Sequence, residues 1–157
     1  MNAECLRIAD QLRRAYTGDP WHGPPLRDLL AGITAEQARA RPLASAHNIW
    51  ELVLHIDIYS RVATEAVHGA PMPMLFGTPK DWPAVGDGTA EWTSATDLLF
   101  HNAEQLAQAI EGFTDSRLQD TVPGRPYDFY YLFHGIVQHG LYHGGQIAIL
   151  RKELSAT

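Results

Sequence analysis

The sequence lacks the features that define several common classes of protein. Its one cysteine, Cys5, has no partner for an internal disulfide, and it lies among apolar helix positions, so we interpret it as a core residue rather than a reactive thiol. No run approaches the ~18 to 20 apolar residues that span a membrane, and charged residues interrupt the N-terminal segment where a signal peptide needs an apolar block. We therefore expect a cytoplasmic protein with no membrane partner.

Positive charge is also scarce. The 12 Lys and Arg residues are outnumbered by 18 Asp and Glu, and no basic stretch is present that could neutralise nucleic-acid phosphates. We therefore expect a small-molecule substrate and no nucleic acid. The length of 157 residues and the 45% share of hydrophobic residues predict one folded domain, 1–157. A domain of this length is stable without a structural metal, so any metal is expected to serve chemistry.

The alternation of apolar and polar residues that is typical of strands is missing, whereas four long segments have apolar residues at helical spacing. We place the four helices at 5–16, 46–68, 89–111 and 128–153. Ser45 and Thr89 are the expected caps of the second and third helices, and Thr34 and Gln37 form an expected capping box in the first connection. The pattern predicts an all-α four-helix bundle. Its first connection is partly ordered, and the proline- and glycine-rich segment 70–88 folds back onto the helices.

The length of segment 70–88 leaves the topology open. An extended chain of this length can cross a whole bundle, whereas a helix of about 20 residues is only about 30 Å long. The second and third helices can therefore run parallel or antiparallel.

Histidine is the residue type in excess, with eight in the chain. His139 and His143 are four residues apart, so their rings lie on one helical face, and they occupy the apolar stripe between Ile136 and Ile147. Two buried neighbouring imidazoles need partners for their ring nitrogens, and a shared cation satisfies both while keeping them neutral. His55, in the apolar segment ELVLHIDIY, is the candidate third ligand.

Three neutral imidazoles bind Zn²⁺, Ni²⁺ or a similar divalent ion and leave a coordination position for water or substrate, as in catalytic sites. Spacing alone leaves the alternative that these are ordinary core histidines bonded to carbonyl groups. We interpret His22, His47 and His68 as solvated or capping residues. For His101 and His134, a surface or core role and a place beside the site both stay open.

The segments AHNIWELVLHIDIY and LFHGIVQHGLYHGGQIAIL resemble the DinB/YfiT-like superfamily of four-helix-bundle metalloenzymes. The resemblance includes the WHGPPLRDLLAGITAEQARARP connection and the DWP sequence, and it covers nearly the whole chain. It implies an up-down-down-up bundle, a homodimer and a metal triad that falls on His55, His139 and His143. Relatives often have a carboxylate where this chain has Gly140, so an acid or base role at that position is not expected.

Two chemical routes are open to such a site. A three-histidine metal ion activates water as hydroxide, or it binds a thiol as thiolate. Glu51, one turn before His55, is the candidate catalytic base for the water route, with a capping role as the alternative. Gln146, one turn after His143, is the second candidate catalytic residue, which orients a metal-bound group or hydrogen-bonds around the ligands. The chain has no H-E-x-x-H sequence, which excludes a zincin-type peptidase.

The resemblance implies the thiol route, because the family's characterised branches look like transferases that join bacillithiol, mycothiol or glutathione to electrophiles. Trp50, Trp82 and Tyr142 are candidates for an apolar wall around an electrophile, with core packing as the alternative. We predict a metal-dependent thiol S-transferase with one divalent ion and a low-molecular-weight thiol as cofactors. The alternatives are a metal-dependent hydrolase and a non-catalytic metal-binding or structural bundle.

Four glycines fall inside the last predicted helix, at positions 135, 140, 144 and 145. Each costs about 1 kcal/mol relative to alanine in a helix interior, so some other interaction must offset them. We expect Gly140 and Gly144 to let a neighbouring helix approach closely, with space for a ligand over the metal as the alternative.

Overall fold

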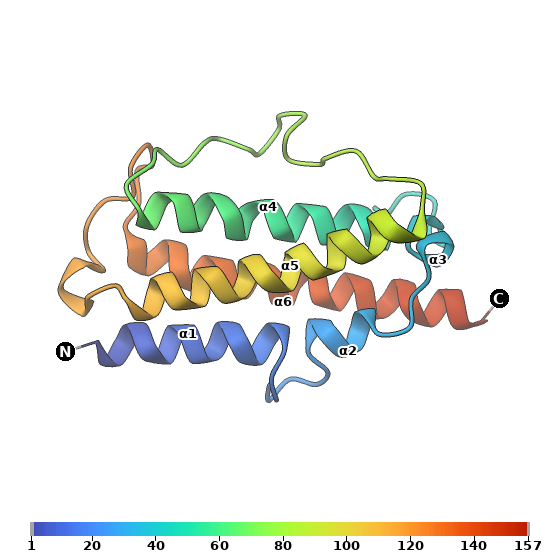
Figure 1. Cartoon of the computed structure of the whole chain (residues 1–157), viewed down its shortest axis with the longest axis horizontal. Helices are drawn as coiled ribbons and strands as arrows, with labels where there is room; N and C mark the ends of the chain where they lie inside the picture. The colour runs from blue at the N-terminus through green and yellow to red at the C-terminus, as the bar shows by residue number, and fades with distance from the viewer. Residues whose placement is uncertain (1, 157) are drawn as a thin grey trace.

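Four long helices pack side by side in the computed structural model, which describes residues 2–156 (Figure 1). The long helices are α1 (Ala3–Tyr16), α4 (Ile49–Val67), α5 (Thr89–Glu111) and α6 (Phe129–Ala156). Two short helices, α2 (Leu26–Leu30) and α3 (Ala35–Arg39), lie in the first connection, and the short 3-10 helix η1 (Asp115–Arg117) precedes α6. Extended pairing within residues 2–156 is limited to one isolated bridge, so the prediction of an all-α fold is confirmed.

The long helices differ in direction. Figure 1 shows α1 and α6 running toward one end of the bundle, and α4 and α5 running together toward the other. Segment 69–88 joins the end of α4 to the start of α5, so it crosses the length of the bundle, as Figure 1 shows. α4 packs against both α5 and α6, and α1 packs against the same two helices. Side chains of α4 and α6 can therefore meet between the two helices.

The start of α4 differs from the prediction. Asn48, and not Ser45, caps this helix: its side chain accepts a hydrogen bond from the Glu51 backbone at 2.9 Å, and the Glu51 carboxylate accepts one from the Asn48 backbone at 3.0 Å. This reciprocal box satisfies two backbone N–H groups at once, which a lone serine cannot do. The capping box predicted for Thr34 and Gln37 is confirmed.

The predicted cap of α5 is also wrong by one residue. Thr89 is the first helical residue, and Gly88 occupies the cap position. The Glu91 carboxylate reaches back to accept hydrogen bonds from the backbone of Asp87 and Gly88, both at 2.9 Å. This carboxylate supplies one half of a capping box, and Gly88 has no side chain to supply the other half. The predicted end of the helix at Gly112 is confirmed.

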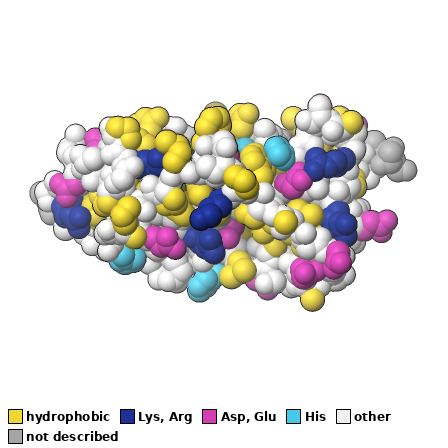
Figure 2. Space-filling model, turned by 90° about the horizontal axis from the view of Figure 1, so that it is seen from above, with side chains coloured by type: hydrophobic (Ala, Val, Ile, Leu, Met, Phe, Trp, Pro, Cys, Tyr) yellow, Lys and Arg dark blue, Asp and Glu magenta, His cyan; other side chains and the backbone are white. Residues whose placement is uncertain are grey.

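The crossover segment 69–88 lies against the helices, as predicted for 70–88. Met72 and Leu75 are buried, and the Met72 backbone donates a hydrogen bond to the Pro123 carbonyl at 2.8 Å. Figure 2 shows the face of the molecule over which this segment passes. Hydrophobic side chains are exposed along that face, with side chains of both charge signs between them. In the described part of the chain, no helix has the length and apolar character that crossing a membrane requires.

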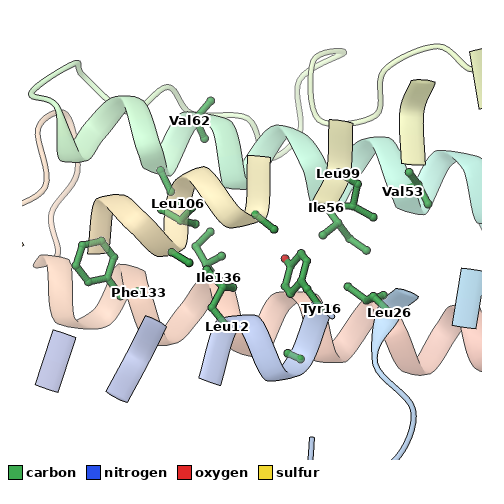
Figure 3. Close-up of a cluster of buried hydrophobic side chains, with 14 of the residues drawn as sticks. Leu12, Tyr16, Leu26, Val53, Ile56, Val62, Leu99, Leu106, Phe133 and Ile136 are labelled. Atoms are coloured by element: carbon green, nitrogen blue, oxygen red, sulfur yellow. The ribbon is translucent and has the colours of Figure 1, made fainter. Parts of the chain in front are cut away.

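The core contains side chains from all four long helices (Figure 3). Leu12 and Tyr16 of α1 face Ile56 of α4, Leu99 of α5 and Ile136 of α6 across the bundle centre. This core holds α4 and α6 in the register that the histidine site requires.

Cys5 belongs to the same core and is fully buried. Burial, together with a hydrogen bond to Asp115, raises the pKa of its thiol to about 12, so the thiol stays protonated and unreactive. The interpretation of Cys5 as a core residue is confirmed.

The glycines of α6 divide into two kinds. A Cβ added to Gly140 would lie 2.7 Å from Cε2 of Tyr16, and one added to Gly144 would lie 3.5 Å from Leu26. The close-packing interpretation is therefore confirmed for Gly140, whereas a Cβ at Gly144 would make only an ordinary van der Waals contact. A Cβ added to Gly135 or Gly145 would meet no heavy atom of the described residues within 4 Å.

Replacing Gly140 with alanine should destabilise the bundle. The new methyl group overlaps the Tyr16 ring, and such overpacking costs about 1 to 3 kcal/mol, more than the helix propensity gained. Urea unfolding measures the change. Gly145→Ala is the matched control, because it should raise the free energy of unfolding by up to about 1 kcal/mol. A Gly140→Ala variant as stable as the parent protein would contradict the packing argument.

Candidate metal centre

Three histidine rings from two helices converge between α4 and α6. His55 comes from α4, and His139 and His143 come from successive turns of α6. Nε2 of His139 lies 3.0 Å from Nε2 of His55, and one ligand-capable nitrogen from each ring lies within 4.8 Å of the others. The structure therefore brings together the three residues that the sequence pattern selected.

Burial keeps these rings neutral. The exposed fractions are 5% for His55 and 6% for His143, and His139 is partly buried. Loss of hydration is the main cause that lowers the pKa of all three imidazoles. For His139, loss of hydration and repulsion from His143 and His55 together lower the pKa to about 3. A neutral imidazole has a free lone pair, which is the form that binds a metal ion.

The orientation of His55 is set by the crossover segment. Its Nδ1–H donates a hydrogen bond to the Asp81 carbonyl at 2.7 Å, and a carboxylate oxygen of Asp81 lies 3.4 Å from the same nitrogen. The hydroxyl of Tyr59 donates to that carboxylate at 2.9 Å. Since a carbonyl oxygen only accepts, the proton of His55 is on Nδ1, and the lone pair on Nε2 faces the other two rings.

His143 is oriented in the same way from within α6. Its Nδ1 lies 2.7 Å from Oε1 of Gln146, so this nitrogen donates and Nε2 remains free for a ligand. This contact agrees with the predicted hydrogen-bonding role of Gln146. Nδ1 of His139 is buried and has no hydrogen-bond partner among the described residues.

Trp82, the residue after Asp81, covers the outer face of His55. The two rings are stacked with centroids 3.9 Å apart and planes 6° apart, and His47 stacks on the opposite face of Trp82 at 3.5 Å. Flat stacking of this kind restricts rotation of the His55 ring and shields it from water. His47, interpreted from the sequence as solvated or capping, therefore also belongs to the surroundings of the site.

The other aromatic candidates occupy different positions. Tyr142 is 67% exposed and meets the His143 ring edge-on, with centroids 4.9 Å apart. Trp50 is buried in the core and packs against Trp92, which matches the alternative interpretation. Of the three aromatic candidates, Trp82 and Tyr142 therefore border the histidine cluster.

Glu51 lies at the α4 N-terminus. Besides its bond to Asn48, its carboxylate accepts hydrogen bonds from Arg41 and from Nδ1 of His47, the latter at 3.1 Å. These contacts are those of the capping alternative. The structure does not bring Glu51 into the group of three histidines that could hold an ion.

His101 and His134 lie outside the cluster. His101 is exposed on α5. His134 lies beside Tyr130 and 3.9 Å from a carboxylate oxygen of Glu4.

Two residues of the site, Asp81 and Tyr59, were not identified from the sequence pattern. Asp81 is buried, which is unusual for a carboxylate and indicates a structural task. The DWP sequence that contains Asp81 contributed to the family resemblance, so it was the available signal. For Tyr59, the available signal was its position one turn after His55, which places both side chains on the same face of the helix.

The donor set fits a divalent transition-metal ion. Bonds of about 2.1 Å from zinc to imidazole place two bound nitrogens at most about 4.2 Å apart. The His55 and His139 pair already lies within this limit, and all three ligand nitrogens lie within 4.8 Å of one another. Neutral imidazoles with two Nδ1 protons already hydrogen-bonded are the form that such ions bind.

The comparisons with known proteins identify one family. A family model described as DinB superfamily matches residues 24–147, a span that contains all three histidines and segment 69–88. No curated protein and no solved structure matches the chain.

Asp81→Ala should weaken metal binding by about tenfold or more, because the variant loses the carboxylate beside His55 and the anchor to Tyr59. Competition with a chromophoric chelator measures the affinity for Zn²⁺. Asp87→Ala, an exposed aspartate of the same segment, is the matched control and should bind as the parent does. Equal affinities of the Asp81 variant and the parent would show that the carboxylate does not position His55.

The metal-free protein should lose stability as the pH falls. The unfolded chain binds protons on these histidines near their ordinary pKa of 6.5, whereas the buried rings resist protonation, in the case of His139 down to about 3. Stability is therefore fully present above pH 6.5 and declines as the pH falls toward 3. Urea unfolding in EDTA at several pH values checks this. A His139→Phe variant should show a shallower decline, and an unchanged slope would contradict the assignment.

Proposed function

This chain belongs to the DinB superfamily, and from this membership and the geometry of the cluster we propose that it is a metal-dependent thiol S-transferase. His55, His139 and His143 hold one divalent ion, with Zn²⁺ and Ni²⁺ as candidates because both accept imidazole nitrogen. The observation that supports the proposal best is the convergence of three neutral imidazoles, two of which have their outer nitrogen bonded to Asp81 and Gln146.

A divalent ion held by His55, His139 and His143 would lower the pKa of a low-molecular-weight thiol and so favour its nucleophilic thiolate form. The sulfur then forms a bond to the electrophilic carbon of the second substrate. The bond from that carbon to the leaving group breaks, the leaving group departs with the electron pair, and the thiol proton passes to solvent. This balance requires no strong base from the protein.

The contacts of the acidic residues are consistent with this route. Glu51 accepts three hydrogen bonds at the start of α4, and the Asp81 carboxylate is engaged by Tyr59 beside His55. We therefore assign Asp81 and Gln146 to positioning the ligands and Glu51 to capping. The water route would need a free carboxylate base, which these contacts do not favour.

The proposal also covers the domain extent, the helix order, the oligomeric state and the location of the protein. We propose one domain over residues 1–157, the up-down-down-up order that agrees with the helix directions in Figure 1, and a homodimer in the cytoplasm. The exposed faces of Tyr142 and Ile149 on α6 offer apolar surface for a second copy.

The experiment is a thiol panel with zinc-loaded protein. Glutathione, bacillithiol, mycothiol and cysteine are each incubated with 1-chloro-2,4-dinitrobenzene, and the coloured thioether is measured. We expect turnover that needs both metal and one thiol. Formation of 2,4-dinitrophenol without thiol would favour the hydrolase, metal binding without turnover would favour the binding role, and absence of bound metal would overturn the whole proposal.

His139→Ala provides the site-specific control for this assay. The variant should bind metal at least about tenfold more weakly and lose turnover, because it removes a ligand without touching the core. The same substitution at His101, exposed on α5, should change neither metal content nor rate. Metal content is measured by elemental analysis of the purified proteins, and full content in His139→Ala would refute the ligand assignment.

A further inference from the structure

A small pocket opens directly beside the histidine cluster. Its volume is about 160 Å³, and its lining includes Tyr59 of α4, Met72 of the crossover segment and Tyr127 just before α6. His139 is part of this lining, so a molecule in the pocket lies against one of the three clustered imidazoles. Tyr131, 66% exposed, also borders the pocket.

Gly135 lies in the lining of the pocket. It is one turn before His139 on α6, inside a helix where glycine is unfavourable. Unlike Gly140, it is not required by the packing of a neighbouring helix, because a Cβ at this position would meet nothing within 4 Å in the described structure. A side chain at position 135 would therefore extend into open space at the pocket lining.

The lining indicates the chemical class of the ligand. Aromatic rings and a thioether favour a flat apolar group, and a cavity of about 150 Å³ is known to accept benzene, so the pocket fits a single ring. Among the residues that the structure describes, no Asp, Glu or Lys lines it. Burial raises the pKa of the Tyr59 and Tyr127 phenols, the Asp81 carboxylate raises that of Tyr59 further, and the charge of nearby Arg125 lowers both. The apolar lining disfavours a cationic ligand, because a charge held against it loses its hydration.

We infer that Gly135 is a specificity-determining residue that keeps open a pocket for a small uncharged ring or similar apolar group, held against His139. That this group belongs to the electrophilic substrate rests on the proposed thiol transfer. Binding in the pocket does not depend on that reaction, so the two can fail separately.

The first experiment measures binding of an unreactive probe, 4-fluorobenzyl alcohol, by ¹⁹F NMR titration of the zinc-loaded protein. Gly135→Leu should weaken binding of the probe by about tenfold or more, because the new side chain fills the pocket. Gly145→Leu, the same change at the other open glycine of α6, should leave affinity within about twofold. Equal binding by the parent and Gly135→Leu, or no binding by the parent, would overturn the inference.

Alanine variants keep the test decisive if leucine at position 135 prevents folding. Gly135→Ala and Gly145→Ala should each raise Tm by about 2 to 4 °C, because both remove a helix glycine without a clash. Only Gly135→Ala should also weaken binding of the probe. A lower Tm for Gly135→Ala would show that the space is not free and would contradict the inference.

The charge of the probe tests the ligand class. Protonated 4-fluorobenzylamine has the same ring and should bind at least about tenfold more weakly than the alcohol. Equal affinity would overturn the uncharged class. In the thiol assay, Gly135→Leu should lower kcat/KM for a benzyl halide but not for iodomethane. A protein that binds the probe but shows no thiol turnover would refute the proposed function and leave the pocket assignment standing.

Discussion

The site depends on the free-energy cost of burying an imidazole nitrogen that has no partner. His55 and His143 are almost fully buried, and each uses its Nδ1 proton on an oxygen acceptor, so that each offers a lone pair to the same small volume. The protein thus fixes which nitrogen of each ring faces inward before any ion arrives. Preorganisation of this kind lowers the entropy that is lost on binding.

The path of the chain makes this arrangement possible. Because α4 and α5 run in the same direction, the segment between them has to return along the bundle (Figure 1). On this path it contacts His55 of α4. Asp81 and Trp82 lie at that point and hold His55 by a hydrogen bond and a stacked ring. A tight hairpin between antiparallel helices could not supply these contacts, so the long crossover is part of the site.

The sequence was sufficient for the features that are local along a helix. The i, i+4 spacing of His139 and His143 within an apolar stripe predicted their shared face, and the helices and the capping box at Thr34 followed from periodicity and residue type. Contacts made through irregular segments were not predictable. Asp81 is 26 residues from His55 and lies where no periodicity constrains the backbone. Asn48 rather than Ser45 caps α4, because Glu51 completes a capping box with Asn48. Considering each polar residue alone does not predict this pairing.

The contact between Tyr16 and Gly140 joins positions 124 residues apart in the chain in one steric constraint. An acidic side chain next to His139 has no space while a tyrosine occupies position 16, and a smaller residue at 16 would leave a void in the core unless 140 were enlarged. The two positions are therefore expected to change together in evolution. To introduce a proton-transferring side chain at position 140 by design, Tyr16 of α1 must first be replaced by a smaller residue, although α1 contributes no histidine to the cluster.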